Sequence, residues 1–489
     1  MKKVGNTNLV FRIAALIVLL IALWGLFFPQ QLNTTSTAIF TWITQNFGWF
    51  YSIAMTAFTV FAIWIGFFSR YKNMRLGADD SKPEYSNKLW FAMLFSAGMG
   101  IGLEPLNFYV SPLGAAGGTE EAAQFAFSKV FLHWGIHPWA NYAIMALVIA
   151  YMQFRKGHPA LISSLFIPLI GKKGAEGPIG KTIDILALLA TAGGVCTTLG
   201  LGVMQINSGM NYIFGIPVTT VVVIATVVIL TVIYVSTAAA GIEKGSAAVS
   251  NANILICALA VIFLFFAGPT VHILNNLTEG LGIYLSDFIK SSFSMGAFGD
   301  SDWYGQWTIY YWGWWIAWAP FTGSFIARIS KGRTVKELIA GVMLLPAGAS
   351  IVWFSVYGTL GIDLGLDAAK DAIQSTSTAL FSVLSQYPLG AILSIVMLVL
   401  VCTFFCSSAT SAAIVLGMYS EKGTMNPSVK SKIVWGILLG ILTLSILLSG
   451  DNGIDMLKTL SIIVGFPFAI IKLASLFSFC KELKNEKLK

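Results

Sequence analysis

The stretch WTIYYWGWWIAWAPF, from Trp307 to Phe321, decides how the rest of the chain is interpreted. At 100° per residue along a helix, five of its aromatic side chains fall within an arc of about 100°. These five are Trp307, Tyr311, Trp314, Trp315 and Trp318. Pro320 removes one backbone hydrogen bond, and basic residues begin at Arg328. The pattern predicts a helix with one face made largely of indole rings.

An aromatic face of this sort has more than one use. Trp and Tyr gather in belts where membrane helices meet water, and they also fill protein cores. This face extends over about three helical turns, which is deep for a belt, and each indole N–H would lack a partner in lipid. Indole faces also bind cations. The aromatic face therefore has three possible interpretations: an interfacial belt, core packing, or a binding site for a methylated cation.

Composition predicts the class of protein. The chain has 489 residues, of which 56% are hydrophobic and 11% charged, with a mean hydropathy of +0.77. These values lie far outside the range of soluble domains and predict an all-α polytopic membrane protein. Apolar runs of about 20 residues give about twelve predicted transmembrane helices. They lie at 9–29, 48–69, 89–110, 129–153, 182–204, 216–240, 248–270, 303–328, 338–361, 386–418, 431–450 and 455–478.

Lysine and arginine predict the orientation. With the N-terminus inside, all but four of the 30 basic residues lie on inner loops, tails or inner helix ends, and the exceptions are Lys129, Lys290, Lys370 and Lys458. This asymmetry favours a multi-pass protein of the cell membrane with both termini in the cytoplasm. The net charge of +8 then reflects topology and does not indicate nucleic-acid binding. The five cysteines lie in or near predicted spans, where no disulfide framework is expected.

The third predicted span changes character at SAGMGIGL (96–103), which Glu104 and Pro105 follow directly. Glycine costs about 1 kcal/mol against alanine in a helix interior, so three glycines at alternate positions predict a break. Close packing of small residues is the structural alternative. A broken helix would free carbonyl groups for an ion or substrate near mid-membrane. Glu104 is the one carboxylate that could reach the membrane interior, where it would mark a functional site, but we expect it to cap the outer end of this span near Pro105.

The fourth predicted span carries a second aromatic group. Trp134, Trp139 and Tyr142 fall within about 140° of one another on a helical wheel. His133 and His137 are four residues apart, but no carboxylate or cysteine nearby completes a metal site. We therefore expect the aromatic residues, and not the histidines, to matter for function.

The tenth predicted span contains Ser407 and Ser408 inside an apolar run. Serines in membrane helices often hydrogen-bond to their own backbone. Their oxygens can also bind sodium when carbonyls from another helix complete the shell. Spans three and eight each open a set of five spans, and two five-helix units of opposite topology are typical of inverted-repeat transporters.

These observations divide the chain into five parts. They are an N-terminal tail with two peripheral helices and a basic loop (1–88), a first five-helix repeat (89–270), an amphipathic outer-surface helix (271–302), a second five-helix repeat (303–478) and a short basic cytoplasmic tail (479–489). Within the second repeat, Thr334 and Glu337 have the spacing of a capping box, which predicts a helix start.

Four motifs resemble the betaine/choline/carnitine transporter family. They are the run 307–334, AGMGIGL (97–103), EPLNFY (104–109) and HWGIHPW (133–139). The resemblance covers essentially the whole chain. It implies a LeuT-like fold of two inverted five-helix repeats preceded by two extra helices, often as a homotrimer in the lipid bilayer. It also implies transport of quaternary-ammonium osmolytes or their precursors.

The resemblance also assigns site residues. An aromatic box for a trimethylammonium group maps to Trp134, Trp139, Tyr142 and Trp315, with Trp314, Trp318, Gly98, Met99 and Gly100 close by. A sodium site maps to the hydroxyls of Ser407 and Ser408 and the carbonyls of Ser96, Met99 and Phe404. A weaker second sodium site maps to Thr191 and Phe321. The resemblance thus implies sodium as the coupling ion and no cofactor.

The chain departs from the family pattern at three places. Family members usually have about six more residues before Glu104, equivalent to roughly 9 Å of helix. Either the third span is shortened on its outer half or the protein is an inactive variant. Val195 occupies a position where the second sodium site would need a hydroxyl group. Thr410 occupies a position where many family members have Asp.

The sequence thus predicts a secondary active transporter that takes up glycine betaine by sodium symport with alternating access. Betaine carries its own carboxylate and no acidic partner is evident in the box, which favours betaine over choline. Family exchangers carry an Arg in span five, and residues 182–204 contain none. Choline or carnitine transport, proton coupling and exchange remain alternatives. A channel or a membrane-embedded enzyme is more remote, since neither a continuous polar pore nor a catalytic set is evident.

Overall fold

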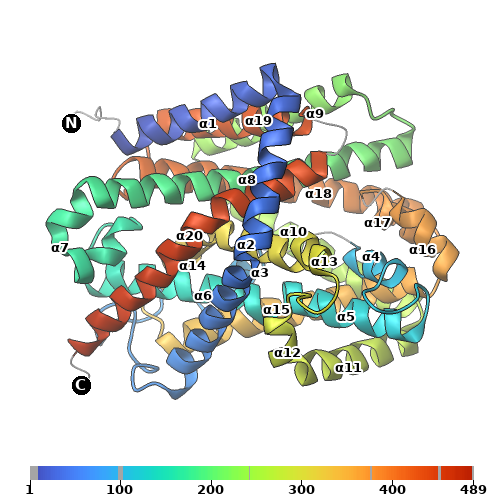
Figure 1. Ribbon diagram of the computed structural model, residues 1–489, viewed down its shortest axis with the longest axis horizontal. Coiled ribbons are helices and arrows are strands. Elements are labelled where there is room, and N and C mark those ends of the chain that lie inside the picture. Colours follow the sequence, from blue (N-terminus) through green and yellow to red (C-terminus); the bar gives the residue numbers. More distant parts are fainter. Residues whose placement is uncertain (1–8, 97–102, 242, 375–376, 450–452, 487–489) are drawn as a thin grey trace.

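The computed structural model describes residues 9–96, 103–241, 243–374, 377–449 and 453–486, and within these ranges it contains helices and no strand (Figure 1). The α-helices are α1 (Leu9–Phe27), α2 (Pro29–Ile63), α3 (Asn87–Ser96), α4 (Glu104–Val110), α5 (Glu120–Trp134), α6 (Ile136–Ala150), α7 (Ile167–Glu176), α8 (Pro178–Phe214), α9 (Thr220–Ala240), α10 (Glu243–Ala267), α11 (Thr270–Ser286), α12 (Phe288–Phe293), α13 (Ser301–Tyr304), α14 (Tyr310–Ile329), α15 (Val335–Ile362), α16 (Leu366–Ile373), α17 (Ala379–Leu384), α18 (Gly390–Ser420), α19 (Val429–Leu447) and α20 (Gly453–Lys484). Three π-helices, η1 (Trp64–Phe68), η2 (Tyr151–Arg155) and η4 (Gly305–Ile309), and one 3-10 helix, η3 (Ser163–Phe166), complete the set. The predicted all-α class is confirmed.

Eight helices of the described chain are long and apolar enough to cross a membrane, and the bent pair of α10 and α11 brings the number to nine. The eight are α1, α2 with η1, α8, α9, α15, α18, α19 and α20. The chain is therefore a multi-pass membrane protein. The predicted count of twelve requires that α3 with α4, α5 with α6, and α14 also span, and it stays a prediction.

The helix that contains the second predicted span, 48–69, begins well before that span. α2 begins at Pro29 and continues with η1 to Phe68 as one helix of 40 residues. Proline suits the first turn of a helix because the amide hydrogens there have no helical partner. The polar stretch after Pro29, which interrupts the apolar run, is therefore helical and not a loop. Figure 1 shows α2 as a long rod that crosses the molecule below α1.

The fourth predicted span is two helices, α5 and α6, which meet at Gly135. This residue has φ −90° and ψ −128°, and a Cβ on it would lie 2.2 Å from the Phe131 carbonyl oxygen. Only glycine fits such a break. The single helical wheel through Trp134, Trp139 and Tyr142 was therefore wrong, because Trp134 ends α5 while the other two residues lie on α6.

At the centre of the molecule, α14 is packed between α6 and α20. The backbones of α14 and α20 approach closely at two glycines, since a Cβ on Gly465 would lie 2.6 Å from the Gly313 carbonyl oxygen. On the α6 side, Asn141 Nδ2 donates a hydrogen bond to the Trp315 carbonyl at 2.9 Å. Lys472 Nζ of α20 donates to the Asn141 carbonyl at 2.6 Å. These contacts fix the aromatic helix on two sides.

Two predicted features are described only in part. The predicted break at 97–102 lies outside the described residues, between the end of α3 and the start of α4. The predicted surface helix 271–302 corresponds to α11 and α12, and α11 makes an angle of 111° with the last part of α10. α11 exposes Val271 and Leu285 but buries Ile273, as an amphipathic helix does. Its position on the outer face, like the five-part division of the chain, stays a prediction.

The predicted capping box at the start of α15 is confirmed. Thr334 Oγ1 accepts a hydrogen bond from the Glu337 amide at 3.1 Å, and Glu337 Oε2 accepts one from the Thr334 amide at 2.8 Å. Two amide hydrogens at the helix start thus gain partners.

A cluster of charged side chains, which we call the ionic cluster, ties the end of α20 to the end of η2. It consists of Asp79, Arg155, Lys156, Glu482 and Glu486. Arg155 lies 2.7 Å from Glu486 and 2.8 Å from Asp79, and Lys156 lies 2.8 Å from Glu482. The tail expected to be merely basic therefore also supplies acidic groups that pair within the protein.

Candidate functional site

The structure gathers the four aromatic residues of the predicted box into one buried cluster. Trp134 and Trp315 meet edge to face, with ring centroids 4.8 Å apart and planes at 75°. Tyr142 lies 6.2 Å from Trp315 and 5.6 Å from Trp139, again at steep angles. The exposed fraction of each of these side chains is at most 6%. Their shared position follows from packing between α5, α6 and α14, and their role in binding stays a prediction.

Trp314 and Trp318 extend the cluster along α14. Trp314 stacks on Trp315, with ring centroids 4.8 Å apart and planes at 10°. Trp314 Nε1 donates to Thr198 Oγ1 at 3.2 Å, and Trp318 Nε1 donates to the Gly194 carbonyl at 2.7 Å. Both acceptors lie on α8. Small and hydroxyl-bearing residues of α8 therefore satisfy the indole N–H groups of Trp314 and Trp318.

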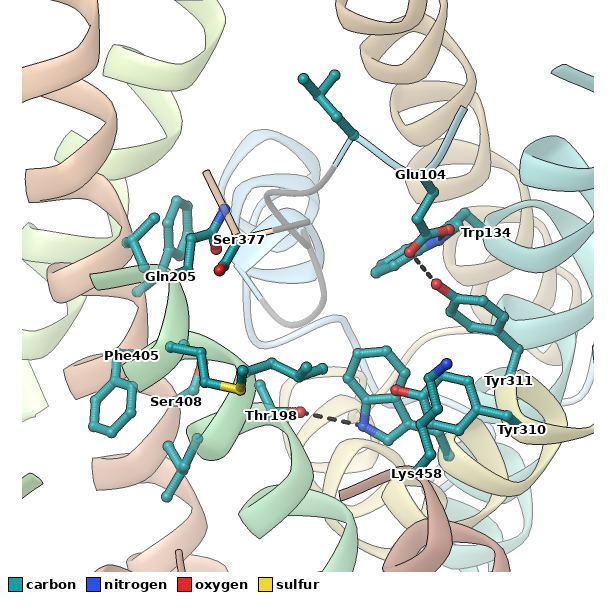
Figure 2. A pocket seen from close by; sticks show the side chains of 18 of the residues that line it. Glu104, Trp134, Thr198, Gln205, Tyr310, Tyr311, Ser377, Phe405, Ser408 and Lys458 are labelled. Atoms are coloured by element: carbon teal, nitrogen blue, oxygen red, sulfur yellow. Dashed lines mark hydrogen bonds between the residues drawn. The ribbon is translucent and has the colours of Figure 1, made fainter. Parts of the chain in front are cut away.

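A cavity of about 260 Å³ lies at one edge of this cluster (Figure 2). Its walls come from α4, the end of α5, α8, η4, α14, α18 and α20, together with one residue before α17. The lining residues are Leu103, Glu104, Asn107, Trp134, Thr198, Leu199, Leu201, Gly202, Met204, Gln205, Trp307, Tyr310, Tyr311, Trp314, Ser377, Val401, Phe404, Phe405, Ser408 and Lys458. Of the six predicted aromatic site residues, only Trp134 and Trp314 line the cavity. The other four are not among its lining residues.

Glu104 has a different place from the one expected. It begins α4, but its carboxylate points into the cavity and does not simply cap an outer helix end (Figure 2). Glu104 Oε2 accepts a hydrogen bond from Trp134 Nε1 at 2.7 Å, and Oε1 accepts one from the Tyr311 hydroxyl. The expectation that no acidic group is near the aromatic residues was therefore wrong. Tertiary contacts between α4, α5 and α14, which no local pattern encodes, bring this carboxylate to the aromatic wall.

Lys458 was assigned to the outer surface, but its side chain lines the same cavity. Its ammonium nitrogen lies 4.6 Å from the centroid of Trp307 and 5.4 Å from that of Tyr310. Ring faces attract cations, so these contacts hold the ammonium group in place. An isolated lysine near the start of an apolar run was the sequence signal for this residue.

The first predicted sodium site is only partly described. Met99 lies outside the described residues, as do Gly98 and Gly100, and Ser96 is the last residue of α3. Ser407 Oγ donates to the Phe404 carbonyl at 3.0 Å, which is the local backbone bond expected of a membrane serine. Ser408 lines the cavity. Ser408 is thus the better placed of the two hydroxyls to meet a ligand.

The second predicted sodium site has one feature in its favour and one against it. Thr191 and Phe321 are buried on α8 and α14, and Thr191 Oγ1 has no hydrogen-bond partner among the described residues. A buried hydroxyl without a partner is costly, so a ligand at this position would relieve it. Val195, one turn along α8, is also buried and offers no oxygen. Thr191 therefore fits a cation better than Val195 does.

The two histidines serve the packing of α5 and α6. His133 Nε2 lies 3.0 Å from Thr308 Oγ1, and His137 Nε2 lies 2.8 Å from Ser292 Oγ. No group of three His, Cys, Asp or Glu that could hold a metal ion occurs among the residues described.

Comparison with known proteins identifies the family of the chain. A family model described as the betaine/carnitine/choline family transporter matches residues 9–488. A probable glycine betaine transporter of Desulfitobacterium hafniense is 43% identical over 98% of each chain. The glycine betaine transporter OpuD of Bacillus subtilis is 42% identical over 98% of this chain and 94% of its own. An ectoine/hydroxyectoine transporter of Virgibacillus pantothenticus is 38% identical over 100% and 99%. The chain therefore belongs to the betaine/carnitine/choline family of transporters and is not an enzyme.

Proposed function

We propose that the protein takes up glycine betaine across the cell membrane. The observation that carries this proposal is the wall formed by Trp134 and Trp314, which stands in a cavity and has its N–H groups bonded elsewhere. The ring faces remain for a cation whose charge is covered by methyl groups, and each such contact contributes up to about 2 kcal/mol when desolvated. The names of the relatives at 42% and 43% identity support the same substrate.

The coupling ion in this proposal is sodium, and the transport cycle is alternating access. Ser408 in the cavity wall and the unpartnered hydroxyl of Thr191 support a hard cation bound next to the aromatic helix. Sodium would link α18 or α8 to α14, so its binding would favour the conformation that holds the substrate. Choline or carnitine as substrate and a proton as coupling ion are the alternatives.

The proposed setting follows from charge and from the family. The inner excess of lysine and arginine supports cytoplasmic termini in the cell membrane. A homotrimer in the lipid bilayer is the assembly that the resemblance implies. Crosslinking in membranes and accessibility of single cysteines placed in each loop test these two points.

Uptake of radiolabelled betaine into proteoliposomes tests the function. We expect saturable uptake that an inward sodium gradient increases and that potassium alone does not support. Choline and carnitine serve as competitors, and a proton gradient without sodium separates the two coupling ions. Absence of uptake of all three substrates would contradict the proposal.

A further inference from the structure

Lys458 is the one lysine among the residues that line the cavity, and its charge has no acidic partner within ion-pair distance in the described chain. Its ammonium group contacts only the faces of Trp307 and Tyr310. Asp455, one turn earlier on α20 and exposed, and Glu104 both attract this ammonium group through space, but neither forms a direct ion pair with it. A cation inside a membrane protein without a directly paired counter-ion is costly and marks a functional position.

Glu104 does not neutralise this ammonium group by direct contact. Its two carboxylate oxygens accept hydrogen bonds from Trp134 and Tyr311. Figure 2 shows the Glu104 and Lys458 side chains entering the cavity from different helices, with Tyr311 between them and Tyr310 beside Lys458. The cavity therefore presents one negative group beside the aromatic wall and one positive group apart from it, and it is neutral as a whole.

We propose that Lys458 binds the carboxylate of a zwitterionic substrate and thereby selects zwitterions over simple quaternary-ammonium cations. This inference rests on the proposed function, because it names the group that recognises the second charge of the substrate. The methylated ammonium group lies against Trp134 and Trp314, on the side of Glu104. The substrate carboxylate meets the Lys458 ammonium, which then gains a directly paired counter-ion.

Charge balance explains the selectivity. A zwitterion adds no net charge to a neutral cavity and pairs with both of its charged groups. A cation such as choline satisfies Glu104 but leaves Lys458 unpaired and adds a repulsive charge near it. An ion-paired hydrogen bond of this kind corresponds to a factor of roughly 10 to 100 in affinity.

The decisive experiment measures binding of betaine, betaine methyl ester and choline to the purified full-length protein. Binding is followed by competition against radiolabelled betaine and, for choline, directly with radiolabelled choline. We expect Lys458→Met to weaken betaine binding roughly 10- to 100-fold and to leave choline binding within twofold or tighter. Lys458→Arg keeps the positive charge and should retain most of the preference for betaine. Lys370→Met, an exposed lysine on α16, is the matched control and should change neither ligand.

The wild-type protein provides a test that does not depend on a variant folding. The methyl ester differs from betaine in lacking the negative charge, so it should compete at least tenfold more weakly. Equal competition by betaine and its ester, or an unchanged betaine-to-choline ratio in folded Lys458→Met, overturns the inference while the proposed function stands. Absence of betaine binding to the wild-type protein would contradict the proposed function itself. Size-exclusion chromatography and thermal unfolding establish that each variant is folded.

Discussion

The cavity and the ionic cluster both contain charged side chains, but these side chains form direct ion pairs only in the ionic cluster. In the ionic cluster, Arg155 and Lys156 lie within 2.9 Å of carboxylates of Glu482 and Glu486. In the cavity, Glu104 and Lys458 face the same space without forming an ion pair. Each charge of the ionic cluster has an oppositely charged partner in direct contact, whereas the two charges of the cavity are held by hydrogen bonds and aromatic ring faces.

This difference separates charge that stabilises the fold from charge that recruits a ligand. A paired cluster near water lowers the free energy of the folded state and gains nothing from a further ion. Unpaired charges in a cavity carry a desolvation cost that a ligand of complementary charge relieves. Substitutions in the cavity should therefore change substrate binding, whereas substitutions in the ionic cluster should change the stability of the fold.

Replacing Trp315 tests the aromatic cluster most severely. Trp315→Leu removes the ring that stacks on Trp314 and meets Trp134, so the wall of the cavity loses its support. We expect the KM for betaine uptake to rise about 30-fold or more, because the displaced Trp134 and Trp314 rings would lose about 2 kcal/mol of cation–π attraction for the substrate. Trp315→Phe keeps a ring face and should stay within about fivefold of the wild type. Equal kinetics for Trp315→Leu and the wild type would contradict a binding role for the cluster.

Glu104→Gln tests the negative side of the cavity. The amide can keep hydrogen bonds with Trp134 and Tyr311 but loses the charge that attracts an ammonium group. We expect about tenfold weaker binding of both betaine and choline, a change of about 1.4 kcal/mol, with little change in their ratio. Glu176→Gln, on the exposed surface, is the matched control. A change confined to betaine would show that Glu104 does not face the ammonium group.

Arg155→Met breaks the ionic cluster without touching the cavity. Glu486 loses its closest cation, so the free energy of unfolding should fall by about 1 to 2 kcal/mol, since water partly screens the pair. Thermal unfolding in detergent measures this as a lower Tm. Lys172→Met removes an exposed pair with Glu176 at 3.9 Å and should leave Tm unchanged. Betaine affinity should stay within twofold in both variants, and a larger loss in Arg155→Met would tie the cluster to the transport site.

The pH dependence of the ionic cluster should be slight near neutrality. Partial burial alone would raise the pKa of Glu486, but hydrogen bonds from Tyr151, Lys156 and Arg155 lower it to about 2. A lowered folded-state pKa means that the stabilisation is fully present above the ordinary glutamate value of 4.5 and is lost as the pH falls towards 2. We expect the Tm difference between wild type and Glu486→Gln to be constant from pH 7 to pH 5.5 and to shrink below pH 4. A difference that shrinks between pH 7 and pH 5.5 would show that Glu486 is not paired in solution.

Much of the fold was predictable because the signals are local. The apolar runs predicted a membrane protein, and the capping box at Thr334 and Glu337 depends on residues three positions apart. The helical wheel through span four was wrong because it assumed a continuous helix. The break at Gly135 brings its Cα so close to the carbonyl of the preceding turn that a Cβ would clash there, and a helical wheel contains no such information. The early start of α2 at Pro29 was missed because polar helical residues resemble a loop in a hydropathy profile.

The sequence by itself determined that this protein is an all-helical membrane transporter of the betaine/carnitine/choline family, since composition, charge asymmetry and family motifs are properties of the chain in any conformation. Only the tertiary structure decided which side chains share the cavity. Glu104 and Trp134 come from the consecutive helices α4 and α5, but Tyr311 and Lys458 come from α14 and α20, which are distant in the chain. The physical reason is that their contacts arise from the packing of α4, α5, α14 and α20, and such long-range packing leaves no periodic pattern in the sequence.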